Sequence, residues 1–143
     1  MARSAEELGA SAAALAARLA ASPVYGLLGL RVAAAGDGEV RLELDCDQRH
    51  ANVDGAVHGG LLAFVADTAM GLAVRTQIAS DWRNKTLDLS VEFIRGARQG
   101  DRLTAVARVD EASRRFRWAS AELAAGAGVL ARARSLNLVE APR

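Results

Sequence analysis

The sequence predicts an α+β fold, in which an antiparallel sheet wraps around one long central helix and an extra helix lies at the N-terminus. Residues 58–79 form a long stretch that is rich in Leu, Ala and Val and contains no proline. Alternating apolar and polar residues, typical of half-buried strands, lie on both sides of this stretch. Of the 143 residues, 51% are hydrophobic but only 4% aromatic, which suits one compact domain with a core of small aliphatic side chains.

We expect a single domain over residues 1–143, with an N-terminal helix over 1–22 and a core over 24–139. Leucines at positions 8, 15 and 19 recur at helical spacing, and Ser22-Pro23 ends that pattern. Two strands are expected next, near 29–35 and 40–47, joined by the Gly36-Asp37-Gly38 turn.

The second of these strands alternates apolar with charged residues. Its apolar set is Val40, Leu42, Leu44 and Cys46. Because Cys46 is the fourth member of this set, we interpret it as a small buried hydrophobe and not as a catalytic thiol. It is the only cysteine, which excludes an intramolecular disulfide and a Cys-x-x-Cys metal site.

The central stretch, residues 58–79, is apolar on nearly all sides, so we expect a helix buried inside the fold. Strands are expected after it near 86–93, 103–109, 115–123 and 129–139, arranged as a four-strand meander. In the first of them the apolar face is predicted to consist of Leu87, Leu89, Val91 and Phe93.

Charge and hydropathy exclude several classes of function. Lys plus Arg is 18 against 17 for Asp plus Glu, which argues against nucleic-acid binding. Charged residues interrupt every long apolar stretch, so no membrane span is expected. Glu6 and Glu7 stand where an export signal would carry positive charge, and we therefore expect a cytoplasmic protein.

Two successive glycines, Gly59 and Gly60, follow His58 at the predicted start of the central helix. Glycine costs about 1 kcal/mol relative to alanine inside a helix, and this chain uses alanine freely elsewhere. One interpretation is that the glycines let the helix start approach the sheet closely. The other is that bare N–H groups at a helix N-terminus face an oxygen of a ligand. The dipeptide alone does not decide between these two interpretations. His50, by contrast, has no such context and is interpreted as a loop residue.

Asp67 is the only acidic residue between Asp54 and Asp81, and it lies among apolar residues of the predicted helix. A carboxylate buried there should be paired, protonated or exposed to a cavity. Pairing with Arg75 would have to bridge eight positions, about 12 Å along a helix. Gly71, one turn further on, is expected to leave open space beside Asp67, which favours a cavity.

The same rise per residue separates Gly59 from Asp67 by about 12 Å. One reacting carbonyl carbon cannot lie about 3 Å from both groups of one helix. If both act on one substrate, they must come from two copies of the chain, which predicts a homodimer as the minimal active unit.

With these residues in place, the chain resembles the hotdog-fold acyl-CoA thioesterases, in particular the PaaI-like (phenylacetyl-CoA thioesterase type) branch. The resemblance covers about residues 24–139. It rests on Asn52, Gly55, His58-Gly59-Gly60, Asp67 and Gly71, on the block 86–95 with Gly100-Asp101, and on 128–131. Gly96 departs from the pattern, because relatives commonly carry proline there.

The resemblance implies roles for five catalytic residues. The N–H of Gly59, with that of Gly60 as the alternative, would polarise the thioester carbonyl. Asp67 of the neighbouring subunit would be the nucleophile or the base that activates water. His58 and Asn52 would orient the thioester, and Thr86 would hold water near the carboxylate.

The resemblance further implies hydrolysis of an acyl-CoA without a metal or organic cofactor, by a homodimer that pairs into a dimer of dimers, a tetramer. Substrate-binding residues are expected at Gly60, Phe64, Met70 and Gly71, with Leu72 and Trp82 as further pocket residues. The alternative is a non-catalytic acyl-CoA-binding or sensing module with the same fold. A purely structural subunit, with neither binding nor hydrolysis, is the third possibility.

Overall fold

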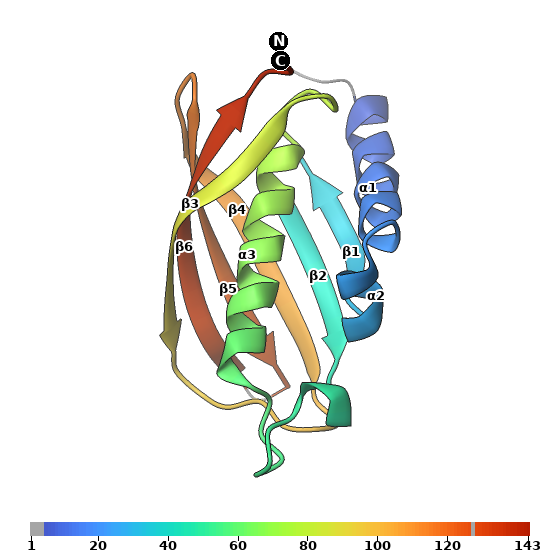
Figure 1. Ribbon diagram of the computed structural model, residues 1–143, viewed down its shortest axis with the longest axis vertical. Helices are drawn as coiled ribbons and strands as arrows, with labels where there is room; N and C mark the ends of the chain where they lie inside the picture. Colours follow the sequence, from blue (N-terminus) through green and yellow to red (C-terminus); the bar gives the residue numbers. More distant parts are fainter. Residues whose placement is uncertain (1–4, 127) are drawn as a thin grey trace.

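The structure is a computed structural model that describes residues 5–126 and 128–143, with side chains from residue 12 onward. A curved sheet encloses one long helix, α3, and a shorter helical layer lies beside β1 (Figure 1). In chain order the elements are α1 Ala5–Ala20, α2 Pro23–Leu28, β1 Arg31–Gly36, β2 Glu39–Asp45, the 3-10 turn η1 Gln48–His50, α3 Gly59–Arg75, β3 Arg83–Phe93, β4 Arg102–Ala112, β5 Phe116–Ala125 and β6 Gly128–Glu140.

The six strands form one antiparallel sheet in the order β1-β2-β4-β5-β6-β3. The expectation of a four-strand meander is therefore wrong for β3, which pairs with β6 at the edge, while β4 pairs with β2. The segment 94–101 carries the chain back along one end of the sheet, where the N–H of Ile94 donates to Leu130 and the N–H of Gly100 donates to Cys46. Strand alternation identifies a strand but not its partner, because pairing is set by contacts that are distant in sequence.

The prediction of a buried central helix is confirmed, although α3 ends at Arg75 and not near residue 79. The Thr76 hydroxyl donates to the carbonyl of Ala73 and accepts from the N–H of Gly38 at 2.7 Å, which fixes the helix end to the β1–β2 turn. The side of α3 that faces the sheet includes Ala66, Ala69 and Ala73, none of which has exposed surface. These small side chains allow the sheet to close tightly around the helix.

The inward set of β2 is also confirmed. Val40, Leu42 and Leu44 are almost completely buried, and Cys46 lies with them in the core. Burial raises the pKa of the Cys46 thiol, so the side chain stays protonated at neutral pH. It is a structural residue.

At the N-terminus, α1 packs against β1 through buried Leu15 and Leu19; the side chain of Leu8 and residues 1–4 lie outside the described part. The sequence prediction missed α2. Pro23 ends the first pattern but also begins this short helix, because proline suits the first turn, where no N–H donor is needed. Gly29 closes α2 in a left-handed conformation with φ 74°, so β1 begins at Arg31.

The two edges of the sheet differ. The edge at β1 is covered by α1, whereas β3 forms an edge that no described element covers (Figure 1). A β-bulge interrupts β3 between Thr86 and Asp88, so Leu87 has no cross-strand partner and does not continue the predicted apolar face. Leu89 and Phe93 share the inward face with Ala131 and its neighbours on β6, yet they are 38% and 55% exposed.

Candidate active site

The loop before α3 is anchored by His50, which is buried with only 3% exposed surface. Its Nδ1 accepts the N–H of Asp47 at 2.9 Å, so Nε2 carries the proton and donates to the carbonyl of Leu28 at 2.7 Å. The interpretation of His50 as an ordinary loop residue is wrong, because it joins the end of α2 to η1. Hydrogen bonds from Arg49 lower the pKa of the Asp47 carboxyl, which caps η1, to about 2.

Asn52 builds the turn that leads into α3. Its Oδ1 accepts the N–H of Asp54 at 3.0 Å and that of Ala56 at 3.2 Å, and its own N–H donates to the carbonyl of Ala56 at 2.7 Å. Gly55 adopts φ 78° in this turn, a left-handed conformation that favours glycine. The Asn52 side chain thus holds the loop that delivers the start of α3.

His58 caps the N-terminus of α3, with its Nδ1 accepting the N–H of Gly60 at 2.8 Å. A Cβ at position 60 would lie 2.9 Å from that nitrogen, so the imidazole in this position requires glycine. The N–H of Gly59 has no hydrogen-bond partner within the described part of the chain. In this structure the N–H of Gly60 is donated to His58, which favours Gly59 as the donor to a thioester oxygen; the choice between the two stays a prediction.

Asp67 lies on α3, half-buried, and its Oδ1 accepts a hydrogen bond from the Thr86 hydroxyl of β3 at 2.7 Å. Arg75 does not pair with it. The Arg75 guanidinium donates instead to Asn84 Oδ1 at 3.2 Å and to the carbonyl of Ser80 at 3.1 Å. Burial, with the nearby charge of Arg18, lowers the pKa of Arg75. The carboxylate is thus held by a neutral hydroxyl and keeps a surface to solvent.

The expectation of open space beside Gly71 is wrong. The Asn84 amide fills it, donating from Nδ2 to the carbonyl of Gly71 at 3.1 Å, and a Cβ on Gly71 would contact the same nitrogen at 3.6 Å. Asn84 thereby joins β3 to the second half of α3. Sequence reasoning missed this residue, which stands next to Arg83 without any local motif.

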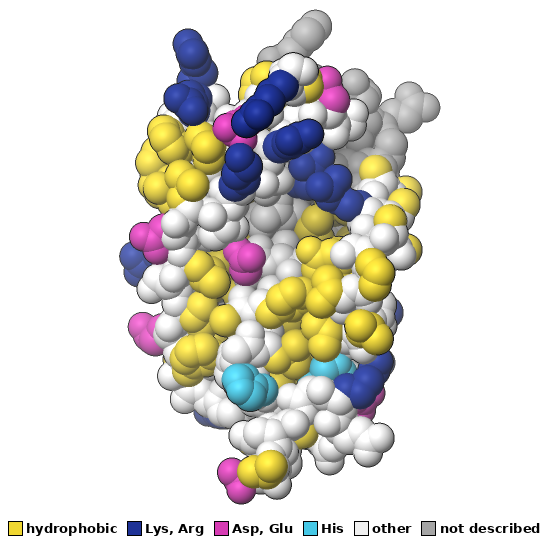
Figure 2. All heavy atoms as spheres, viewed as in Figure 1, with side chains coloured by type: hydrophobic (Ala, Val, Ile, Leu, Met, Phe, Trp, Pro, Cys, Tyr) yellow, Lys and Arg dark blue, Asp and Glu magenta, His cyan; other side chains and the backbone are white. Residues whose placement is uncertain are grey.

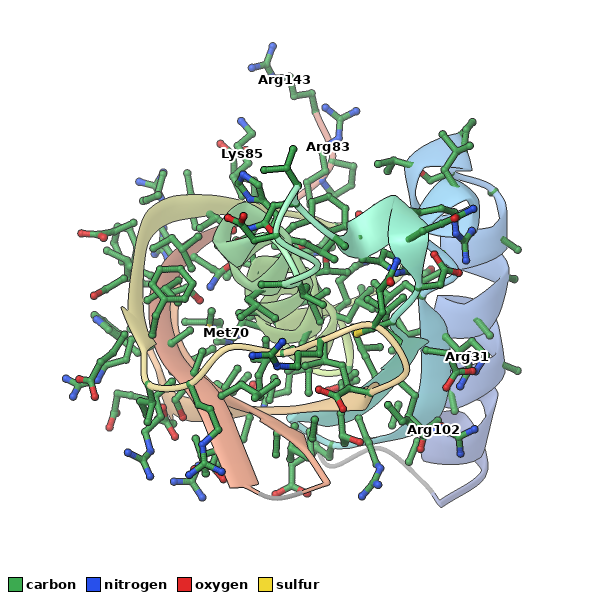
Figure 3. The ribbon with its side chains drawn as sticks, turned by 90° about the horizontal axis from the view of Figure 1, so that it is seen from below. Arg31, Met70, Arg83, Lys85, Arg102 and Arg143 are labelled. Atoms are coloured by element: carbon green, nitrogen blue, oxygen red, sulfur yellow. The ribbon has the colours of Figure 1, made fainter. Side chains whose placement is uncertain are left out.

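The expected pocket residues separate into core and surface. Met70 has no exposed surface and lies within the sheet-enclosed space when the molecule is seen from below, and Leu72 is 6% exposed (Figure 3). Both belong to the hydrophobic core, so assigning them to a pocket is wrong; their helical positions face the packed side of α3. Phe64 is half-buried and packs against Tyr25, with ring centroids 5.7 Å apart. Trp82 is half-buried in the turn after α3.

Phe93, at the end of β3, lies beside the start of α3. A Cβ on Gly59 would meet its ring at 3.5 Å, an ordinary contact. On the face that presents α3, hydrophobic side chains gather below and beside an acidic group, and basic side chains gather at the end where the C-terminus lies (Figure 2). β3 thus runs along the part of α3 that carries Gly59 and Asp67, with Phe93 beside the former and Thr86 bonded to the latter.

Within the described residues, no set of three or more His, Cys, Asp and Glu side chains is placed to hold a metal ion. None of the described helices has both the length and the apolar character needed to cross a bilayer.

Comparison with known proteins identifies the family. The Thioesterase superfamily model matches residues 54–131. A Pseudomonas aeruginosa protein named "Putative esterase PA0474" is 37% identical over 90 residues, which cover 63% of this chain and 67% of that protein. The structure of the Escherichia coli PaaI protein from the phenylacetic acid degradation operon superposes with a TM-score of 0.86 at 21% identity, over 94% of this chain and 97% of that one.

A hypothetical thioesterase of Streptococcus pneumoniae, solved with coenzyme A, has the same fold with a TM-score of 0.73 at 21% identity, over 80% of this chain and 88% of that one. The family match spans more than half of the chain and includes the start of α3, Asp67 and Thr86. The chain therefore belongs to the thioesterase superfamily and is a thioester hydrolase with the hotdog fold.

Proposed function

We propose that the protein hydrolyses an acyl-CoA to the free acid and CoA, in a homodimer whose sites each join Gly59 of one chain to Asp67 of the other. The observation that carries this proposal is the state of two groups on α3. The N–H of Gly59 is unpaired at the helix N-terminus, and the carboxylate of Asp67 is held by Thr86 but still partly exposed. The hypothetical thioesterase of Streptococcus pneumoniae, which has the same fold and was solved with coenzyme A, supports CoA as the carrier.

The distance between the two groups supports a site made by two chains. They are eight residues apart on one helix, which corresponds to about 12 Å. A twofold axis that sets two α3 helices antiparallel brings the start of each helix to the middle of the other. Each dimer then has two equivalent sites.

The free edge of β3 supports the same dimer. It is an edge strand of eleven residues with exposed Leu89 and Phe93 on its inward face. A long edge strand with exposed apolar side chains pairs readily with another chain. Pairing β3 with the β3 of a second copy would continue the sheet and cover both side chains.

In the proposed reaction the thioester oxygen accepts a hydrogen bond from the N–H of Gly59, at the positive end of the helix dipole. With the partner subunit's Asp67 as base, the carboxylate takes a proton from water while the water oxygen bonds to the carbonyl carbon. The tetrahedral intermediate collapses, the C–S bond breaks, and the proton passes to the CoA thiolate. With Asp67 as nucleophile, its oxygen bonds to the carbonyl carbon, the C–S bond breaks and CoA leaves as the thiolate. Water then cleaves the mixed anhydride into the free acid and the Asp67 carboxylate, and a proton from that water passes to the thiolate.

The other site residues act on these two groups. His58 fixes the first turn of α3 through its bond to Gly60, which leaves Gly59 as the free donor. Asn52 holds the preceding loop, and Thr86 orients the carboxylate of Asp67. A single N–H donor to the thioester oxygen, such as that of Gly59, contributes roughly 100- to 1,000-fold in turnover.

The test compares Asp67→Asn with the matched control Asp37→Asn, which changes an exposed carboxylate in the β1–β2 turn. A panel of short, long and aromatic acyl-CoAs is hydrolysed in the presence of a thiol reagent that reports free CoA. We expect Asp67→Asn to lose at least 100-fold in kcat while it keeps the oligomeric state, and Asp37→Asn to match the wild type. Normal turnover by Asp67→Asn overturns the mechanism. Tight binding of acyl-CoA by the wild type without thiol release establishes the non-catalytic module instead.

We also propose that two dimers associate into a tetramer. Val106 and Trp118 are 46% and 41% exposed on the face of the sheet that points away from α3. A second dimer packed there would cover them. Sedimentation equilibrium at micromolar concentration should give the mass of four chains, and a mass of two chains would contradict the proposal.

A further inference from the structure

Two polar residues interrupt the inward, buried face of β6. Asn137 has no exposed surface and Ser135 has 5%, while their inward neighbours Ala131, Ala133 and Val139 are apolar core residues. Burying an amide or a hydroxyl costs free energy unless each polar atom finds a partner. The positions of these two side chains therefore need a reason beyond packing.

The register of the sheet places Asn137 opposite Thr86. The two residues pair across β6 and β3, so both side chains point to α3. The Thr86 Oγ1 lies 2.7 Å from Asp67 Oδ1 and 3.5 Å from the Asn137 amide, whose other end lies 2.8 Å from the Ser135 Oγ. The four side chains form one continuous polar chain from the interior to the carboxylate.

A count of protons fixes how this chain must be oriented. The Thr86 hydroxyl has one proton, and an ionised Asp67 can only accept, so that proton belongs to the 2.7 Å bond. If the Asn137 amide oxygen faces Thr86, two oxygen atoms lie 3.5 Å apart at a partly buried position, and neither donates a proton to the other. A half-turn of the nearly symmetric amide exchanges its oxygen and nitrogen without moving another atom. The amide N–H then points to Thr86, and the amide oxygen accepts from the Ser135 hydroxyl.

We infer that Asn137, supported by Ser135, is a positioning residue that keeps the Thr86 proton directed at the partner-facing carboxylate of Asp67. This inference rests on the proposed function, because it assigns Asn137 to the same reaction. The buried amide blocks Thr86 from donating toward the interior, so the hydroxyl binds the carboxylate oxygen Oδ1. That leaves Oδ2 of Asp67 for water or the thioester carbon.

The test is a double-mutant cycle between Asn137→Leu, which keeps a similar volume, and Thr86→Val. Hydrogen bonds to charged groups are among the stronger ones in proteins. We expect each single variant to lose about tenfold in kcat with KM within about twofold, because orientation of the carboxylate matters after the substrate is bound. The double variant should lose no more than Thr86→Val alone, since both changes remove the same directed proton. Ser135→Ala should show a smaller loss of kcat.

Thr76→Val is the control for the loss of a buried polar side chain, since Thr76 has no exposed surface and lies at the other end of α3. It should lower the melting temperature and leave kcat unchanged. If Asn137→Leu does not fold, Asn137→Asp replaces it, because a carboxylate has a similar shape but cannot donate to Thr86. A wild-type kcat in a folded Asn137 variant, or losses that multiply with Thr86→Val, would overturn the inference.

A second readout does not depend on turnover. In the wild type the buried Ser135 hydroxyl proton, donated to the Asn137 amide oxygen, should exchange slowly with solvent and give an NMR resonance that disappears in Asn137→Leu. If the wild type releases no CoA, the proposed function fails, yet this resonance still decides whether the polar chain is directed. If turnover is normal and the resonance is unaffected by Asn137→Leu, only the inference fails.

Discussion

Replacing Gly60 with alanine tests the helix cap at the start of α3. The new Cβ would lie 2.9 Å from His58 Nδ1 and 3.1 Å from its Cε1, closer than such atoms approach. Because His58 is exposed, its ring can swing away, but the 2.8 Å cap to the N–H of residue 60 is then lost. Losing a cap costs about 1 kcal/mol, and replacing glycine by alanine in a helix returns up to about 1 kcal/mol. The free energy of unfolding should therefore change little in Gly60→Ala.

The sign of the effect depends on His58. In a His58→Ala background there is neither a cap to lose nor a ring to displace, so Gly60→Ala should stabilise the protein by up to about 1 kcal/mol. Urea unfolding followed by circular dichroism measures all four proteins of this cycle. Acyl-CoA hydrolysis should fall in Gly60→Ala with little loss of stability, because the displaced imidazole no longer fixes the turn that presents Gly59. An equal effect of Gly60→Ala in both backgrounds would refute the reasoning.

Three further predictions follow from single side chains. Met70→Ala should lower the free energy of unfolding by about 3 kcal/mol, the usual cost for a fully buried methionine, and a loss below about 1 kcal/mol in urea unfolding would show that Met70 is not core. Leu89→Lys should yield a folded, inactive monomer by sedimentation, because it places a charge on the exposed inward face of β3; a retained dimer would contradict the proposed interface. Hydrogen bonds from Arg49 hold the pKa of Asp47 at about 2, below the value of about 3.9 in the unfolded chain. The ionised Asp47 therefore stabilises the fold above about pH 4, and this contribution is lost as the pH falls through about 2. Acid titration followed by circular dichroism should show a smaller loss over this range in Asp47→Asn, and identical curves would speak against the linkage.

Local patterns predicted the elements whose neighbours in sequence are also their neighbours in space. The apolar character of residues 58–79 indicated a buried α3, and alternation indicated the inward set of β2. The pairing of β3 with β6 could not be predicted in this way, because it joins residues about fifty positions apart. The bulge at Leu87 is a further consequence of that pairing, and a strictly alternating sequence does not reveal it.

The candidate site likewise contains some residues that the sequence identifies and others that depend on how distant strands are placed. Gly59, Asp67 and Thr86 could be identified from the sequence and the family pattern, and the structure joins the last two by a hydrogen bond. The filling of the space beside Gly71 by Asn84 depends on how β3 crosses α3, which no local pattern encodes. Asn137 did leave a signal, because it and Ser135 are polar residues in phase with the apolar inward positions Ala131, Ala133 and Val139 of β6.

The two sides of α3 explain how one short chain holds the carboxylate of Asp67 in place. On one side, Ala66, Ala69, Met70 and Ala73 have no exposed surface and lock the helix against the sheet. On the other side, Asp67 is left to a single hydroxyl from β3. Because small residues bring helix and sheet close, Thr86 reaches the carboxylate directly, at 2.7 Å. In the proposed mechanism the alanine-rich composition therefore serves catalysis as well as packing, because it sets the distance at which the sheet can orient the carboxylate.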